Sequence, residues 1–259
     1  MVKNFKCVVS YKGTNYCGWQ KQKQENIITV QGIIEYALQK FFNGEIKTTG
    51  ASRTDSGVHA FGQVFSFMVE TKLDGKAVKS VLNGILPPDI RICSCAEAPF
   101  DFSPRRDVKT KLYRYVIYNR PFLRPVFADL AWHVYDRLDM DKMKGLLPLF
   151  KGRKNYFSFS AASDKEDHFR EIKSITIKKS GPWITFDFKG RGFLYNMVRR
   201  ITAAFVEHAK GNLSAGDIDG LFRVQDRANL TFTAPPQGLY LVKIIYEKKR
   251  AGTCQTEVI

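Results

Sequence analysis

The hydrophobic positions of the chain fall into two successive series of strands and helices. In the first series, apolar side chains at every second position or in short runs predict four strands, at 5–11, 46–51, 63–69 and 90–96. Apolar residues at three- and four-residue spacing predict helices over 29–42 and 75–86. Pro87 and Pro88 end the second helix, because a proline ring blocks helical continuation. The order is therefore strand-helix-strand-strand-helix-strand.

The second series repeats this order with additional helical segments. The same patterns predict four more strands, at 111–118, 171–179, 183–189 and 238–246. The middle two form a hairpin around Ser180-Gly181-Pro182, a typical turn composition. Helices are predicted over 139–150 and 193–209, with a shorter one at 214–224.

Two consecutive series of this kind predict an α+β fold. We expect two ferredoxin-like β-α-β-β-α-β halves that form one central, mainly antiparallel sheet with helices on one side. The boundary is expected within 97–110, which gives an N-terminal unit of 1–104, a C-terminal unit of 105–250 and a flexible tail of 251–259.

Composition narrows the class of protein. The 259 residues are 44% hydrophobic and 25% charged, as in soluble globular proteins, and no apolar stretch approaches the roughly 18 residues of a membrane span. The first residues contain no signal-peptide core. The five cysteines are odd in number and include no CxxC pair, and the four histidines are scattered. We therefore expect a cytoplasmic protein without a disulfide framework or a metal site.

The charge points to a polyanionic partner. Lys and Arg number 41 against 25 Asp and Glu, a net charge of +16. Residues 1–104 hold 12 basic and 9 acidic residues, whereas 105–259 hold 29 and 16. The segment 105–115 contains five basic residues together with Tyr113 and Tyr115, a combination suited to phosphates and bases. No long amphipathic helix has the Lys-rich face of a membrane-surface binder. An RNA-binding cleft is therefore expected. We place it between the two lobes, on the side of the sheet opposite the helices.

The segment Ser52-Arg53-Thr54-Asp55-Ser56-Gly57-Val58-His59-Ala60-Phe61-Gly62-Gln63 carries the clearest candidate for chemistry. It connects two predicted strands, where a scaffold presents a functional loop. Asp55 is ionised at neutral pH without a helper base, and carboxylates act as nucleophiles or bases at sugar carbons and electron-poor rings. Arg53 and Arg199 are available to hold the carboxylate or to contact phosphate. From spacing alone, an Asx-turn in a solvated loop is an equally good interpretation of Asp55.

Two other motifs allow different interpretations. Asp55-Ser56-Gly57 matches the D-[ST]-G of aspartic proteases, but those need two such carboxylates and this chain has one. Lys189-Gly190-Arg191-Gly192-Phe193-Leu194 partly matches the aromatic strand of an RNA-recognition module, although helical spacing begins at Phe193. A non-catalytic RNA-binding module of this RRM-like type therefore stays open as the alternative function.

The segment around Asp55 resembles the signature of the TruA family of tRNA pseudouridine synthases. The resemblance extends along almost the whole chain, in order, through these further blocks: Tyr11 to Gln22, Val30-Gln31, Leu82-Asn83 with Leu86-Pro87 and Asp89-Ile90, Lys111 to Tyr115, Phe193-Leu194 with Met197-Val198-Arg199, and Ala234-Pro235 with Gly238-Leu239. Each block alone is moderately specific, and their joint occurrence in order makes a chance match very improbable.

The resemblance implies a homodimeric, cofactor-free enzyme that converts uridine to pseudouridine at positions 38, 39 and 40 of the tRNA anticodon stem-loop. It places the catalytic role on Asp55, base packing on Tyr113, pairing with the aspartate on Arg199 and nucleotide flipping on Arg53. The resemblance also suggests further RNA-contacting residues: Arg105, Lys111, Arg114, His59 and Gln63.

The chain departs from the family pattern at a few positions. Ser52 and Ser56 replace the usual Gly and Ala, and Lys12 replaces a common Asp. Residues 102–106 are Phe-Ser-Pro-Arg-Arg where Phe-His-Ala-Arg-Phe is common, so a contact of that histidine is missing here. No departure removes a catalytic group. Whether the aspartate attacks the sugar or the ring, or abstracts a sugar proton, stays open.

Overall fold

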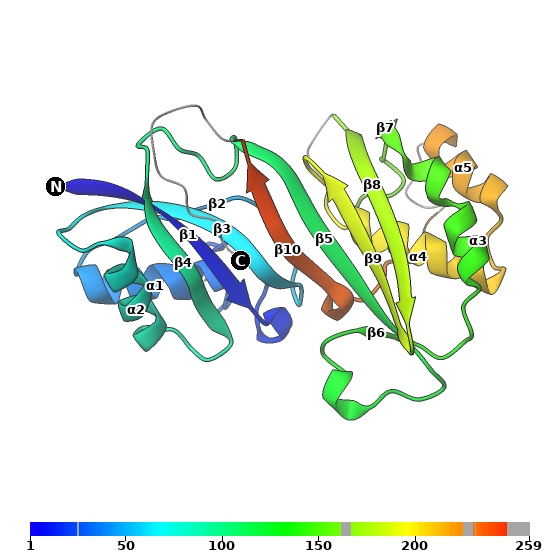
Figure 1. Cartoon of the computed structure of the whole chain (residues 1–259), viewed down its shortest axis with the longest axis horizontal. Helices are drawn as coiled ribbons and strands as arrows, with labels where there is room; N and C mark the ends of the chain where they lie inside the picture. The colour runs from blue at the N-terminus through cyan, green and yellow to red at the C-terminus, as the bar shows by residue number, and fades with distance from the viewer. Residues whose placement is uncertain (25, 162–166, 225–229, 231, 248–259) are drawn as a thin grey trace.

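One continuous sheet forms the framework of the molecule, with the long helices behind it (Figure 1). The computed structural model describes residues 1–24, 26–161, 167–224, 230 and 232–247. The strands are β1 (Val2–Tyr11), β2 (Thr49–Gly50), β3 (His59–Glu70), β4 (Ile90–Ala98), β5 (Val108–Asn119), β6 (Trp132–Val134), β7 (Gly152–Asn155), β8 (Phe169–Ser180), β9 (Trp183–Gly190) and β10 (Leu239–Tyr246). The helices are α1 (Val30–Phe42), α2 (Gly75–Ile85), α3 (Met140–Gly145), α4 (Met197–Lys210) and α5 (Ala215–Val224), with 3-10 turns at Gly13–Asn15, Pro125–Phe127, Leu147–Phe150 and Pro236–Gly238.

The strands follow the order β4-β1-β3-β10-β5-β9-β8-β7, with β2 beside β3 and β6 beside β5. The first half has the order β4-β1-β3-β2, and the corresponding strands of the second half have the order β10-β5-β9-β8. In each half the last strand lies next to the first. The strand pairs are antiparallel except β3–β10 and β5–β6. The last strand thus joins the halves, since Tyr240 pairs with His59 on one side and with Arg114 on the other. The expected α+β fold with a mainly antiparallel sheet is confirmed.

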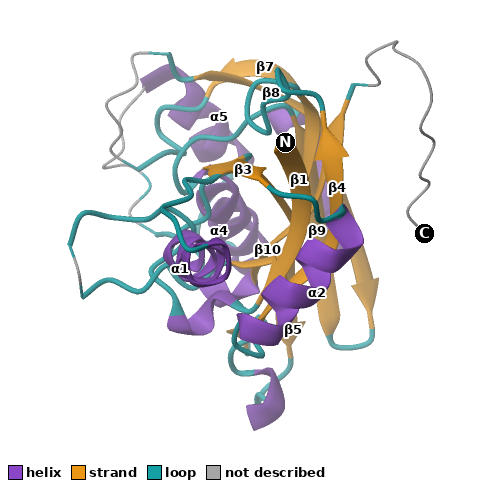
Figure 2. Ribbon diagram, turned by 90° about the vertical axis from the view of Figure 1, so that its left-hand side faces the viewer, coloured by secondary structure: helices purple, strands orange, loops and turns teal. Residues whose placement is uncertain are grey.

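The main core lies between the sheet and the helices (Figure 2). The side chains of Tyr113, Tyr115 and Ile117 on β5 are buried against this helical layer, whereas the intervening residues are only partly covered. In the second half, the ring of Phe205 on α4 packs 5.1 Å from Phe150 and 5.4 Å from Phe186 on β9. The aromatic cluster fixes α4 on the sheet, and α4 in turn borders the site described below.

Three predicted elements differ from the structure for local reasons. The helix predicted over 193–209 begins at Met197, because Asn196 adopts a left-handed conformation with φ of 58°. The helix predicted over 139–150 divides into α3 and a 3-10 turn, since Pro148 has no N–H to continue the helical ladder. The strand predicted at 46–51 is reduced to the two residues of β2. β6 and β7 were not predicted, because three or four residues are too short to show alternation.

None of the helices within the described ranges is both long and apolar enough to cross a membrane. The predicted tail at 251–259 and the last residues of the predicted C-terminal unit lie outside the described residues.

Candidate active site

A cleft of about 1040 Å³ opens over the middle of the sheet, between the N-terminal ends of α1 and α4. Its walls include Gln31 of α1, Met197 of α4 and the loop that carries Asp55, and Tyr113 and Leu239 of the joining strands lie at its floor. The cleft is therefore on the face of the sheet that bears the helices. The expectation of a cleft on the opposite face is wrong, because α1 and α4 stand apart and leave the central strands accessible between them.

Asp55 lies in this cleft with an arginine beside it. Nη1 of Arg199 is 3.3 Å from Oδ2 of Asp55, although the two residues are 144 positions apart in the chain. The exposed fraction of the side chain is 17% for Asp55 and 14% for Arg199, so the ion pair is largely shielded from water. Burial raises the pKa of Asp55, and the positive charge and hydrogen bond of Arg199 oppose that rise.

Arg199 is held in place by two further acceptors. Its Nε donates to the carbonyl oxygen of Ala234 at 2.7 Å, and its Nη1 donates to Oδ1 of Asn196 at 2.9 Å. On a helical wheel Arg199 is opposite the apolar face of its helix, which favours an exposed side chain. The structure instead covers that side with the segment around Ala234, which precedes β10. The arginine is thus directed at Asp55 before any substrate binds.

Tyr113 presents its ring and hydroxyl beside this ion pair. Its hydroxyl lies 2.8 Å from Oγ of Ser52, and its ring packs edge-on against Phe193 at 5.3 Å. Burial is the main cause that raises the pKa of Tyr113 to about 12, and the negative charge of Asp55 adds to it. The phenol therefore stays neutral at physiological pH. Nζ of Lys111 donates to the same Ser52 hydroxyl at 3.0 Å and to the carbonyl of Ala51 at 2.9 Å.

The Asp55 loop rests on an N-terminal loop that approaches it too closely for side chains. A Cβ atom on Gly18 would lie 2.4 Å from the carbonyl oxygen of Thr54, and one on Gly13 would lie 2.0 Å from that of Val58. Gly18 also has a φ of 81°, a conformation that favours glycine. Trp19, next in the chain, donates its backbone N–H to Thr54 at 3.1 Å. The two loops are therefore packed backbone to backbone.

Replacing Gly18 with alanine is expected to destabilise the protein and to displace Asp55. The new methyl group meets the Thr54 carbonyl in an unfavourable backbone conformation, which together should lower the free energy of unfolding by at least about 2 kcal/mol. Urea unfolding measures this loss. Gly84→Ala is the matched control, because that α2 glycine has no atom within 4 Å of its added methyl and should gain about 0.5–1 kcal/mol. Equal stability of the two variants would contradict the proposed close packing.

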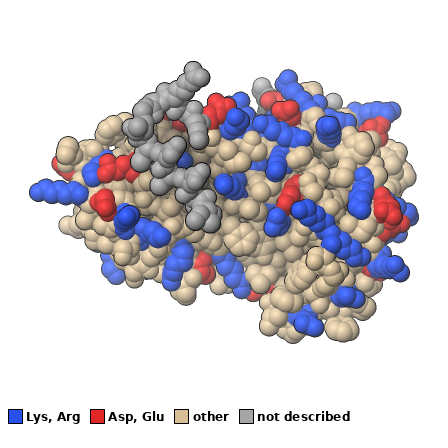
Figure 3. Space-filling view, in the orientation of Figure 1, with Lys and Arg blue, Asp and Glu red and all other residues tan. Residues whose placement is uncertain are grey.

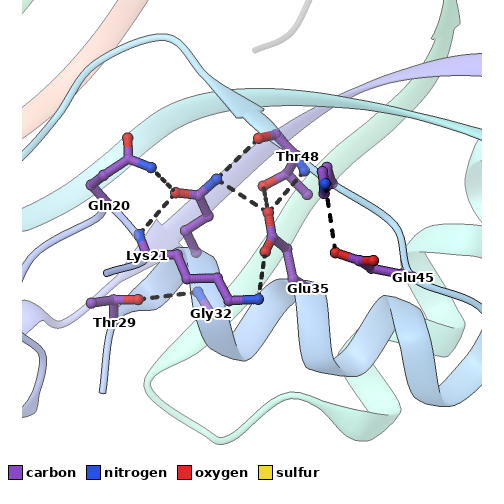
Figure 4. A network of polar contacts seen from close by, with 9 residues as sticks. Gln20, Lys21, Thr29, Gly32, Glu35, Glu45 and Thr48 are labelled. Atoms are coloured by element: carbon purple, nitrogen blue, oxygen red, sulfur yellow. Dashed lines mark hydrogen bonds and ion pairs between the residues drawn. The ribbon is translucent and has the colours of Figure 1, made fainter. Parts of the chain in front are cut away.

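A buried polar network on α1 fixes the other side of the cleft (Figure 4). Oε1 of Glu35 accepts hydrogen bonds from the backbone N–H of Thr48 at 2.9 Å and from its hydroxyl at 3.1 Å. Gln31 links the segments around Thr48 and Lys21. Its side chain donates to the Thr48 carbonyl at 3.0 Å and accepts from the backbone N–H of Lys21 at 2.9 Å. Lys21 closes the network with an ion pair of 3.2 Å to Glu35. Thr48 leads directly into β2 and the Asp55 loop, so α1 positions that loop from behind.

The charge of the cleft is almost entirely positive. Arg53, Arg105 and Arg170 line it together with Lys111, and Asp55 is the only carboxylate among its described lining residues. Arg53 and Arg105 are exposed, whereas Lys111 is held by Ser52 and Ala51. On the opposite face, Lys and Arg also predominate, with fewer Asp and Glu scattered among them (Figure 3). The charged lining of the cleft is therefore suited to a polyanionic ligand.

Three residues expected to contact RNA lie elsewhere. His59 is buried and is fixed between the N–H of Gly13 at 2.9 Å and the carbonyl of Asp129 at 2.9 Å. Burial lowers its pKa, which favours the neutral ring. Gln63 is fully buried and donates to the Ser52 carbonyl at 2.6 Å. Arg114 points to the opposite face and forms a two-pronged ion pair with Asp187. None of the three faces the cleft.

The structure also adds residues that motif analysis had not assigned a role. Ser52, Phe193 and Asn196 each contact Tyr113 or Arg199 directly. Ser52 and Phe193 stand within the motif blocks, but only the fold shows their contacts. Among the described residues no group of three or more His, Cys, Asp and Glu side chains is placed to hold a metal ion. The expected absence of a metal and of a cofactor stays a prediction.

Comparisons with known proteins agree on one family. The family model described as tRNA pseudouridine synthase matches residues 7–105 and 147–247, which include Asp55 and Arg199. A relative named tRNA pseudouridine synthase A from Thermoanaerobacter sp. (strain X514) is 37% identical over 246 residues, covering 95% of this chain and 100% of the relative. Relatives with the same name from Ruminiclostridium cellulolyticum and Geotalea uraniireducens are each 38% identical, at 95% and 100% coverage.

Similarity to solved structures is much weaker. A chain from a crystal structure of a Cbf5-Nop10-Gar1 complex covers 78% of this chain and 44% of its own length, with 12% identity and a TM-score of 0.37. That similarity is too low to bear on the fold or on the site.

Proposed function

We infer the function from the premise that this chain belongs to the tRNA pseudouridine synthase family. It is an isomerase that converts uridine in tRNA to pseudouridine. Our proposal goes further: the target uridines are at positions 38, 39 and 40 of the anticodon stem-loop, and Asp55 is the catalytic carboxylate. The observation that carries this assignment is a shielded Asp55–Arg199 pair beside Tyr113, in a cleft whose other charged lining residues are all basic.

The reaction needs no external reagent. The bond between N1 of the base and C1′ of the sugar breaks, the base rotates, and C5 bonds to C1′. The proton lost from C5 is balanced by one gained at N1, so substrate and product are isomers. A carboxylate promotes the cleavage, and its shielding from water strengthens its interaction with the reacting nucleotide. The pair with Arg199 opposes protonation of Asp55 in this shielded place.

Access to the base requires that the nucleotide leave its stack. Extrusion costs a few kcal/mol, which interactions with the protein must offset. In our proposal Arg53, exposed at the mouth of the cleft, occupies the vacated space, and the extruded base packs on Tyr113. Arg105 and Lys111 lie along the same cleft and contact flanking phosphates. The alternative of an RRM-like binding module loses support, since β9 ends at Gly190 and its aromatic motif does not continue as a strand.

The resemblance supplies the remaining parts of the proposal. Two copies of the chain form the working enzyme, and it acts without cofactor or metal in the cytoplasm, where tRNA is modified. We also propose that residues 1–104 and 105–250 form two ferredoxin-like halves. The identical strand order in the two halves of the sheet supports that division.

The decisive experiment is incubation of the purified protein with an unmodified tRNA that carries uridine at positions 38–40, without added cofactor. Pseudouridine is then mapped by chemical labelling and primer extension. We expect modification at those positions and none in a matched tRNA with cytidine there. Pseudouridine confined to other positions would refute the assigned target, and a requirement for an added cofactor would refute the cofactor-free mechanism.

A further inference from the structure

A second hollow, of about 710 Å³, adjoins the cleft that holds Asp55. It is lined by Thr49, Ser103, Arg105, Arg106, Val108, Lys111 and Arg191. Thr49, Arg105 and Lys111 also line the cleft, so the two hollows are continuous. Four of its seven lining residues are cationic, and none is acidic.

The cations of the hollow all belong to the C-terminal unit but come from separate segments of it. Arg105 and Arg106 belong to the turn between β4 and β5, and Arg191 follows the end of β9. All three arginine residues are exposed, and none has a carboxylate partner among the described residues. Three guanidinium groups gathered without a counter-ion repel one another, and an anion between them removes that cost.

The turn that presents two of these arginines is rigid. The N–H of Ser103 donates to Oδ2 of Asp107 at 3.0 Å, and the N–H of Arg106 donates to the Ser103 hydroxyl at 3.3 Å. The Asp107 carboxylate is thus engaged within the turn. The hydroxyl of Tyr246 on β10 donates to the carbonyl of Pro104 at 2.9 Å, which anchors the turn to the sheet. Little backbone entropy is lost when a ligand binds such a preorganised turn.

We infer that this hollow, called here the arginine pocket, binds backbone phosphate of the RNA strand next to the nucleotide that enters the cleft. Guanidinium groups match phosphate through paired N–H donors, and the continuity of the two hollows places the pocket on the path of the same strand. The inference deepens the proposed function, on which it rests for the identity of the RNA. It adds Arg106 and Arg191 to the residues that bind substrate.

The test measures the salt dependence of RNA binding. The ligand is a fluorescent anticodon stem-loop with cytidine at positions 38–40, so that no turnover occurs, and binding is followed by anisotropy between 50 and 200 mM salt. For Arg106→Gln/Arg191→Gln we expect about tenfold weaker binding and a slope of log Kd against log salt that is lower by about one to two, since each lost phosphate contact contributes about 0.7–0.9. A slope equal to that of the wild type would overturn the inference.

Matched controls distinguish this pocket from general charge. Lys76→Gln/Lys79→Gln removes two exposed cations from α2, away from both hollows, and is expected to change affinity less than twofold. An equal loss in that variant would overturn the inference. If the double variant does not fold, the single variant Arg106→Gln, on the exposed turn, replaces it in the test. Its slope of log Kd against log salt is expected to be lower by about one.

A second experiment tests whether the arginine pocket binds the phosphates of an RNA backbone or free inorganic phosphate. Calorimetric titration with inorganic phosphate at constant ionic strength is expected to give no saturable binding below millimolar concentration. Tighter binding that Arg106→Gln/Arg191→Gln abolishes would assign the pocket to free phosphate and overturn the RNA assignment. The outcome is independent of catalysis: if the wild type forms no pseudouridine, the proposed function fails, while the slope on cytidine-containing RNA still decides the role of the pocket.

Discussion

Replacing Asp55 with asparagine is expected to reduce pseudouridine formation by about 10²–10⁴-fold, the contribution typical of a positioned catalytic acid or base. The carboxamide has almost the same shape as the carboxylate and still accepts a hydrogen bond from Nη1 of Arg199, so the cleft should keep its structure. It has no negative charge to promote cleavage of the N1–C1′ bond. Single-turnover assays with saturating enzyme measure the chemical step directly.

Binding and stability separate the catalytic role from a structural one. Affinity of Asp55→Asn for the stem-loop should stay within about threefold of the wild type, because phosphate contacts dominate RNA binding. Asp129→Asn is the matched control: this aspartate also pairs with a cation, Lys12 at 2.9 Å, but the pair lies outside the cleft. Its activity should be unchanged. Undiminished pseudouridine formation by Asp55→Asn would refute the role proposed for Asp55.

Hydrophobic periodicity was sufficient for most of the fold. The alternation through β1 and the helical spacing through α1 gave both elements almost at their observed bounds, since each buries a regular face. Periodicity carries no information about where two helices of the same layer stand apart. It therefore predicted the sheet and helices correctly and placed the cleft on the wrong face. The start of α4 was missed because the conformation of Asn196, not the apolar pattern, ends the preceding loop.

For the candidate site, the motifs identified the residues, but their contacts depended on the fold. The motif around Asp55 and the blocks around Tyr113 and Arg199 identified residues that the fold brings together from three distant parts of the chain. Hydrogen bonds from these side chains to backbone groups far away in the sequence could not be predicted from the motifs. The wheel position of Arg199 indicated solvent, and only the carbonyl of Ala234 shows why this side chain is shielded. His59 and Gln63, in the same motif as Asp55, turn out to brace the scaffold instead of facing the cleft.

Arg199 controls the protonation of Asp55, and this has a consequence for pH dependence. Burial raises the pKa of Asp55, and Arg199 lowers it again. If the ionised carboxylate is the active form, activity is lost as the pH falls through that pKa. Without Arg199, burial acts unopposed, so the pKa rises and the ionised fraction at any given pH falls. The acidic limb of the activity profile must then move to higher pH.

For Arg199→Gln we therefore expect kcat/KM at neutral pH to fall about 10²–10³-fold, as when one preorganised electrostatic donor is removed, with the acidic limb displaced upward. Arg199→Lys keeps the charge but not the geometry, and should restore the position of the limb more fully than the rate. Arg200→Gln, a loss of the neighbouring arginine that donates to the Ser158 and Ser160 carbonyls, should cost stability without moving the limb. Profiles of kcat/KM between pH 5 and 9 compare the variants. A parallel drop in Arg199→Gln, with its limb unmoved, would show that the arginine acts on something other than the charge of Asp55.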